Sequence, residues 1–320
     1  MTYADAIRSA LAEEMARDER VILLGEDIAL YGGAFRVTRG LADQFGSARV
    51  INTPISENSF VGVAVGAALT GLRPVVEIMF MDFITLAMDQ IVNHAAKLHY
   101  IYGGQVSVPM VVRAPAGAGR GYGASHSQSL EAWFLHTPGI KVVAPSTPRD
   151  AHGLLKAAIR DDNPVLVVEN KLLYGVKGDV PDAEEVILIG RAAVVREGQD
   201  VTLIAYSRMT ALALEAAATL EQGGLQCEVV DLRSLAPLDV EAITASVAKT
   251  HRAVVIEEDT RRGGVGAEVA AVLADQGFRH LDSPVRRVAC EDVPIPCSPT
   301  LEQAVLPSVE KIVAAVESLI

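Results

Sequence analysis

Glu57 stands where a short predicted strand gives way to an apolar helix rich in small residues. Ligands of open α/β sheets bind beyond the carboxyl ends of the strands, so a carboxylate here is well placed for chemistry. Enclosed by Ile55 and Phe60, it would lose hydration and could share a proton with the ring nitrogen of a ligand. The alternative is that Glu57 only stabilises the helix N-terminus through the macrodipole. Spacing alone leaves both interpretations open.

A glycine-rich run follows another predicted strand, with glycines alternating from position 117 to position 123 and His126 shortly after them. Glycine lets a backbone approach a ligand closely, at an entropic cost. The imidazole of His126 could act as a general acid or base near neutral pH, or could be a surface or capping residue. Arg120 in the same run could be solvated or could meet an anionic substrate.

Two further segments allow a chemical and a structural interpretation. The run Gly263–Glu268 resembles a dinucleotide fingerprint, but Val269 stands where the third glycine belongs, so a tight turn packing a helix on its strand fits better. The run Asp161–Pro164 offers oxygen ligands for a hard cation, and a plain helix stop before proline explains it equally well.

Charge and composition exclude several classes of function. Forty acidic against 28 basic residues give a net charge of -12, which would repel nucleic acid and anionic membranes. The three cysteines, at 227, 290 and 297, have neither zinc-site nor disulfide-framework spacing. Residues 1–20 lack the apolar segment of a signal peptide, and the most apolar stretch, 60–69, is too short to span a bilayer, so we expect a cytoplasmic protein.

The elements that must position these residues follow an α/β alternation. We expect strands at 21–24, 50–51, 74–79, 109–113, 141–143 and 164–168, and one helix over 83–98. A second series of strands is expected at 201–205, 227–231, 253–257 and 285–289, with helices at 209–222, 240–249, 266–276 and 307–320. The predicted architecture is two doubly wound domains, 1–178 and 191–320, joined by a linker at 179–190 that is rich in glycine, proline and acid.

A series of motifs in fixed order covers essentially the whole chain: GED (25–27), TPISE (53–57), TGLRPVVEIMFMDF (70–83), DQIVNHAAK (89–97), GGQVSVPMVVRAP (103–115), SHSQSLEAW (125–133), PGIKVVAPS (138–146), AIRDDNPVLVVENKLLYG (158–175), DLRSLAPLD (231–239) and EEDTRRGGVGAE (257–268). In these motifs the chain resembles the beta subunit of the decarboxylating first component (E1) of 2-oxo acid dehydrogenase complexes. The acetoin dehydrogenase beta subunit shares the pattern. The resemblance implies a transketolase-like fold, with a pyrimidine-binding domain followed by a transketolase C-terminal domain.

The resemblance also implies roles for the matched residues. Glu57 is similar to the glutamate that hydrogen-bonds the aminopyrimidine of thiamine diphosphate, and His126 to the histidine that assists acyl transfer to the lipoyl group. Apolar contacts and a ring stack around the pyrimidine are implied for Ile55, Met79 and Phe83. Oxygens for a structural potassium ion are implied for Met110, Ala158, Asp161 and Asn163.

One motif of thiamine diphosphate enzymes is absent. They hold the diphosphate through Mg²⁺ on a Gly-Asp-Gly stretch followed by a distant Asn, whereas here Gly178-Asp179 is followed by valine. In the family the alpha subunit holds that half of the cofactor. The resemblance therefore implies an α₂β₂ heterotetramer whose cofactor sites bridge two chains.

The implied reaction is decarboxylation of pyruvate or a branched-chain 2-oxo acid, followed by reductive acylation of a lipoyl group on the dihydrolipoyl acyltransferase core. Acetoin would undergo carbon–carbon cleavage instead. Outside this family, the alternatives are a nicotinamide-dependent oxidoreductase that uses Gly264 and Gly266, and a non-catalytic partner subunit with only the fold. A non-catalytic subunit would leave Glu57→Gln silent in the reconstituted complex.

Overall fold

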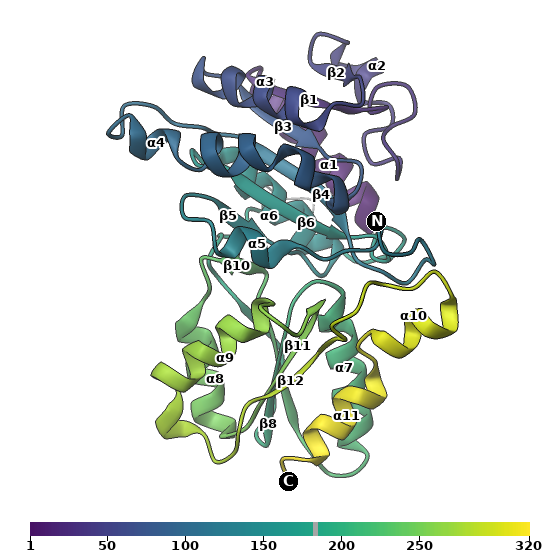
Figure 1. Ribbon diagram of the computed structural model, residues 1–320, viewed down its shortest axis with the longest axis vertical. Helices are drawn as coiled ribbons and strands as arrows, with labels where there is room; N and C mark the ends of the chain where they lie inside the picture. Colours follow the sequence, from purple (N-terminus) through teal and green to yellow (C-terminus); the bar gives the residue numbers. More distant parts are fainter. Residues whose placement is uncertain (182–184) are drawn as a thin grey trace. The chain divides into compact units, whose positions relative to one another are not determined.

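A computed structural model describes residues 1–181 and 185–320 of the chain. They form two compact units: Met1–Ala116 with Trp133–Ile189, and Gly117–Ala132 with Gly190–Ile320. Each unit is a sheet flanked by helices, which confirms the predicted α/β class (Figure 1). Part of the predicted linker, residues 182–184, lies outside the described residues, and the predicted domain limits stay a prediction.

The sheet of the first unit is parallel, with strand order β5-β6-β4-β3-β1-β2. Its strands are β1 (Val21–Glu26), β2 (Val50–Thr53), β3 (Arg73–Glu77), β4 (Val111–Ala116), β5 (Lys141–Val143) and β6 (Val165–Asn170). Every residue of β1, β4 and β6 is buried, as expected for strands covered on both faces. In this register Leu24 lies beside Ile51 on one side and Val76 on the other, so the carboxyl ends of neighbouring strands meet at one edge.

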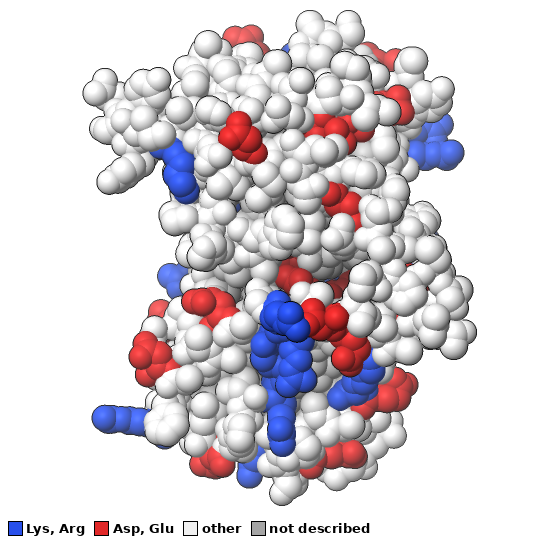
Figure 2. All heavy atoms as spheres, viewed as in Figure 1, with Lys and Arg blue, Asp and Glu red and all other residues white. Residues whose placement is uncertain are grey.

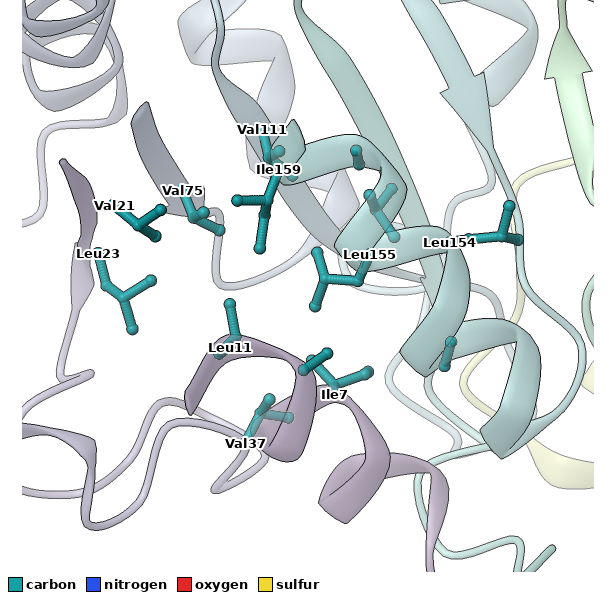
Figure 3. Close-up of a cluster of buried hydrophobic side chains, with 14 of the residues drawn as sticks. Ile7, Leu11, Val21, Leu23, Val37, Val75, Val111, Leu154, Leu155 and Ile159 are labelled. Carbon is teal, nitrogen blue, oxygen red and sulfur yellow. The ribbon is translucent and has the colours of Figure 1, made fainter. Parts of the chain in front are cut away.

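Helices α1 (Tyr3–Arg17) and α6 (Pro148–Arg160) pack together in the core of the first unit. Thr2 and Thr147 cap them, because each hydroxyl accepts a hydrogen bond of 3.1 Å from the amide three residues on. Figure 3 shows leucine and isoleucine side chains of both helices pointing toward one another and toward valines of the strands. Two further helices of this unit are α2 (Leu41–Phe45) and α3 (Glu57–Leu69), and α5 (Glu131–Leu135) crosses the boundary between the units.

The prediction of a single helix over 83–98 is wrong. The chain forms a 3₁₀ helix, η1 (Met81–Ala87), then a π-helix, η2 (Asp89–Ala95), and the short α4 (Leu98–Ile101). The amide of Phe83 donates to the carbonyl of Phe80, three residues back, at 2.9 Å, whereas the amide of Ala96 donates to the carbonyl of Ile91, five residues back, so the backbone hydrogen-bond pattern changes along the segment. Apolar residues at helical spacing in this segment are nevertheless buried, at positions 84, 87, 91 and 95.

The second unit has strand order β12-β11-β8-β9-β7, parallel except for β7 at the edge. The strands are β7 (Ala193–Arg196), β8 (Val201–Ala205), β9 (Cys227–Asp231), β11 (Ala253–Thr260) and β12 (Arg286–Cys290), and a short strand β10 (Ser234–Ala236) follows β9. The helices are α7 (Arg208–Glu221), α8 (Val240–Thr250), α9 (Val265–Gln276), η3 (Phe278–His280), α10 (Pro299–Val305) and α11 (Val309–Glu317). The second predicted series is confirmed to within a few residues at each end. In the described part of the chain, no helix has the length and apolar character needed to cross a bilayer.

Candidate active site

Two buried carboxylates meet where β1 ends and α3 begins. Glu26 is the last residue of β1 and Glu57 the first of α3, and each side chain is 5% exposed. The amide of Ser56 donates a hydrogen bond to Glu26, which holds the start of α3 at the end of the strand. The structure therefore places Glu57 at the carboxyl edge of the sheet, where the sequence predicted it.

The two carboxylates are near enough to interact electrostatically. Burial, and secondly the charge of Glu57, raise the pKa of Glu26 to about 7. In the described part of the chain neither carboxylate has an ion-pair partner, and Oε1 of Glu26 and Oγ1 of Thr53 are buried without a hydrogen bond. Such a site can accept a hydrogen bond or a proton from a ligand.

Apolar residues predicted to contact a ring belong to the same unit. Met79 and Phe83, both half-buried, lie on the connection from β3 into η1, and α3 packs against η1. The rings of Phe80 and Phe83 pack edge to face with centroids 6.2 Å apart. Ile55, just before α3, is 81% exposed, so its side chain is open to a ligand or to another chain.

A second group of buried carboxylates in this unit shares one buried cation. Arg113, 1% exposed, donates to Glu77 at 2.6 Å and to both oxygens of Glu169 at 2.7 and 2.8 Å. The hydroxyl of Tyr174 donates to the same carboxylate of Glu169 at 2.7 Å. This closed network fits a structural role, because each buried charge already has its partner.

The glycine-rich run belongs to the second unit, and buried carboxylates hold its backbone. Glu258 accepts a 2.6 Å hydrogen bond from the amide of Ala118, and Glu302 accepts from the amides of Gly119, at 2.8 Å, and Gly121, at 3.1 Å. The amides that could have approached a ligand therefore approach a carboxylate of the chain itself.

His126 is half-buried at the end of this run. Its Nδ1 lies 3.0 Å from the hydroxyl of Ser125, and its amide donates to the carbonyl of Gly123 at 3.3 Å. Beyond it, Glu131 accepts from the hydroxyl of Tyr206 at 2.8 Å, and Asp259 accepts from the amide of Ala132. Burial raises the pKa values of Glu131 and Asp259; the charge of Asp259 adds to the effect at Glu131, and that of Glu257 to the effect at Asp259.

Three of the residues predicted to bind potassium, Ala158, Asp161 and Asn163, are linked by hydrogen bonds. The amide of Asp161 donates to the carbonyl of Ala158, and the side chain of Asp161 accepts from Asn163 at 2.8 Å and from Lys141 at 2.5 Å. Arg73 donates to the carbonyl of Asp161 at 2.9 Å. The Met110 carbonyl, at the start of β4, accepts from the amide of Val165. Each carbonyl has a second lone pair for a cation, and the potassium site stays a prediction.

Comparisons with known proteins agree over the whole chain. The profile of the transketolase pyrimidine-binding domain matches residues 1–177, and that of the transketolase C-terminal domain matches residues 190–312. The pyruvate dehydrogenase E1 component subunit beta-2, mitochondrial, of Oryza sativa subsp. japonica is 49% identical over 98% of this chain and 85% of its own length. The corresponding subunit beta of Rickettsia felis is 47% identical over 100% and 98%. The chain belongs to the beta-subunit family of the E1 component of 2-oxo acid dehydrogenases.

A solved structure, the inactive beta4 tetramer of a split-gene transketolase, superposes with a TM-score of 0.82 at 28% identity, covering 100% of this chain and 98% of its own. The two predicted transketolase-like domains are thereby confirmed. The acetoin dehydrogenase alternative is not favoured, because the reported curated relatives are pyruvate dehydrogenase beta subunits.

The nicotinamide alternative finds no support at its proposed turn. The amide of Gly266 donates to Glu257 at 2.6 Å, and Arg287 donates to the same carboxylate at 2.5 Å. A β-carbon at Gly264 would lie 2.5 Å from the carbonyl oxygen of Thr260. The glycines therefore pack α9 onto β11, as the tight-turn interpretation predicted.

Sequence reasoning did not single out several residues of this E1 beta-subunit fold. Glu26 was present only within a motif, although a carboxylate that ends an apolar strand is itself a signal. Glu302 gave no local signal, because its partners lie some 180 residues away in the sequence.

Proposed function

We propose that this chain supplies the aminopyrimidine half of a thiamine diphosphate site in a pyruvate dehydrogenase E1 component, completed by an alpha subunit. Pyruvate is the proposed substrate because the reported relatives are pyruvate dehydrogenase subunits. The observation that carries the proposal is the pair of buried carboxylates, Glu26 and Glu57, at the carboxyl edge of the sheet, which have no ion-pair partner among the residues that the structure describes. A dry carboxylate without a partner is suited to a ring nitrogen that can carry a proton.

The residues present fit that half of the cofactor. Thiamine diphosphate, when bound, supplies the nucleophilic carbon and the electron sink of the reaction. Glu57 would accept a hydrogen bond from the pyrimidine ring and hold the proton it shares with the ring nitrogen. The ring of Phe83 offers a stacking face, and Ile55 and Met79 offer apolar contacts that exclude water.

The diphosphate half points to a second chain. The sequence has no Gly-Asp-Gly stretch, and the described residues contain no cluster of three or more His, Cys, Asp or Glu able to hold a metal ion. We therefore assign Mg²⁺ to the alpha subunit. Large apolar side chains of the first unit are exposed, and the face of this unit in Figure 2 is mostly uncharged, which suits a protein partner: Leu30, Tyr31, Ile55, Tyr100, Ile101 and Tyr102.

The remaining assignments are parts of the same proposal. His126 assists acyl transfer to the lipoyl group of the acyltransferase core. Potassium, bound by oxygens at 110, 158, 161 and 163, stabilises the first unit. The assembly is α₂β₂, and the location cytoplasmic.

The first experiment is calorimetric titration of thiamine diphosphate with Mg²⁺ into the full chain alone, and into the chain mixed with its candidate alpha subunit. We expect tight binding only in the mixture. Tight binding by the chain alone would mean that it holds the diphosphate itself and would contradict the divided site.

The second experiment replaces Glu57 by Gln in the reconstituted complex. The isosteric amide cannot take up the proton, so pyruvate-dependent activity should fall by about 100-fold or more. Glu19→Gln, which changes an exposed carboxylate of the same unit, is the matched control and should keep full activity. Equal activities of the two variants would remove Glu57 from the reaction and favour a non-catalytic subunit.

A further inference from the structure

Glu302 is a buried carboxylate that accepts hydrogen bonds from backbone amides of the glycine-rich run. The run and the residues that follow it up to α5, 117–130, are called the glycine-rich loop below. It lies on α10, is 3% exposed, and accepts from Gly119 at 2.8 Å and from Gly121 at 3.1 and 3.3 Å. In the described part of the chain it has no ion-pair partner. The amides are therefore what stabilises its charge.

The loop backbone is shaped to receive an anion. Gly119 and Gly121 have φ of 93° and 69°, the left-handed region, and alternation of this kind turns nearby amides toward one point. Such concave backbone sites ordinarily bind phosphate. Here the chain's own carboxylate takes that place, through charge-assisted hydrogen bonds that are stronger than neutral ones.

The anchored stretch leads directly to His126. Gly123 lies against the side chain of Cys297, so that a β-carbon there would collide with Sγ, and the carbonyl of Gly123 accepts from the His126 amide at 3.3 Å. Glu258 holds the start of the same stretch through Ala118. The backbone is thus fixed from position 118 to position 126 by contacts within the second unit.

We propose that Glu302 is a positioning residue, which holds the glycine-rich loop so that the imidazole of His126 is presented for acyl transfer. The inference rests on the proposed role of His126. Glu302 itself touches no reacting atom. Its replacement by Gln leaves one acceptor oxygen and replaces the other by an amide N–H donor that faces the amides of Gly119 and Gly121, so the loop should loosen although the size of the side chain is unchanged.

The loop is tested directly by hydrogen exchange on the reconstituted complex. In Glu302→Gln, amides of residues 117–126 should exchange about tenfold faster than in the parent, while peptides from β8 and β9 stay unchanged. Glu291→Gln, an exposed carboxylate of the same unit, is the control and should alter neither. Unchanged exchange in the loop would overturn the proposal. If Glu302→Gln does not assemble into the complex, Glu302→Asp and Glu258→Gln test the same hydrogen bonds to the loop.

Two activity assays separate positioning from general damage. The lipoyl-dependent rate should fall about tenfold in Glu302→Gln, whereas decarboxylation of pyruvate with an artificial dye as electron acceptor should stay within about twofold, because only acyl transfer uses His126. Equal losses in both assays would indicate a merely structural role.

His126→Ala distinguishes failure of this inference from failure of the proposed function. If His126→Ala lowers the lipoyl-dependent rate and Glu302→Gln does not, the positioning role alone is wrong. If His126→Ala is silent, the role of the histidine fails, and hydrogen exchange still decides whether Glu302 holds the loop.

Discussion

The first unit buries carboxylates at two places along one edge of its sheet, and they differ in what surrounds them. Glu77 and Glu169 both form ion pairs with the guanidinium of Arg113 inside the chain. Glu26 and Glu57 are equally buried and, in the described part of the chain, have no cation beside them. Both places lie where parallel strands end, so position in the fold does not separate them.

The difference shows that burial of an acid is a weak mark of function, whereas burial without compensation is a strong one. Removing a charge from water costs several kcal/mol unless a partner repays it. In the Arg113 network, ion pairs and hydrogen bonds within the fold offset that desolvation cost. For Glu26 and Glu57, no cation among the described residues offsets the desolvation cost, so a ligand or another chain has to offset it, as expected of a divided site.

The largest expected effect comes from removing the cation that Glu77 and Glu169 share. Arg113→Met leaves two buried carboxylates without their cation and should lower the free energy of unfolding of the chain by about 3 to 5 kcal/mol. Denaturant unfolding at pH 7 measures it. Arg149→Met, which removes the exposed ion pair with Glu185, is the matched control and should cost less than about 1 kcal/mol. Similar losses in the two variants would show that the buried network does not need its charge.

The next largest effect is the pH dependence of stability caused by Glu26, in the carboxylate pair without an ion-pair partner. The pKa of Glu26 is raised from an ordinary 4.5 to about 7, so its contribution to stability is fully present below pH 4.5 and is lost as the pH rises through 7. Glu26→Gln does not titrate. It should therefore be more stable than the parent by about 2 to 3 kcal/mol at pH 8, and by little at pH 5.

Calorimetric melting of the chain without an alpha subunit, at pH 5 and pH 8, measures this difference. Glu13→Gln is a useful contrast, because the pKa of Glu13 is lowered to about 2 by its hydrogen bonds to Lys156 and His152, despite the opposing effect of burial. That variant should lose stability at both pH values. A Glu26 variant that is less stable than the parent at pH 8 would mean that its charge is compensated after all.

The sequence predicted the strands other than the short β7 and β10, because the signal of a buried strand is local. Apolar β-branched runs such as those ending at Glu26 and Glu77 are almost entirely buried, and their composition is typical of strands covered on both faces. The irregular segment 81–101 was not predicted, because the apolar positions that it buries, 84, 87, 91 and 95, also fit the spacing of an α-helix.

The candidate site was predictable where its residues lie in short motifs, and not where they meet by folding. Glu57 and His126 could be named from their neighbours. The presence or absence of a cation beside a buried carboxylate could not be predicted. It depends on residues such as Arg113 and Glu169, which lie 56 positions apart in the sequence. The anchoring of the glycine-rich loop by Glu302 escaped for the same reason.

The smallest expected effect decides between the two interpretations of Glu57 that the sequence left open. If the carboxylate only stabilised the N-terminus of α3, Glu57→Gln would cost about 0.3 to 1 kcal/mol at every pH where it is charged. If it is an uncompensated acid beside Glu26, the variant should be equal to the parent or slightly more stable at pH 8, because one repulsive charge is removed. The pKa of Glu26 should also fall, so the decline in melting temperature between pH 5 and pH 8 becomes shallower than in the parent. A loss of stability with an unchanged slope would assign Glu57 to the helix rather than to a ligand.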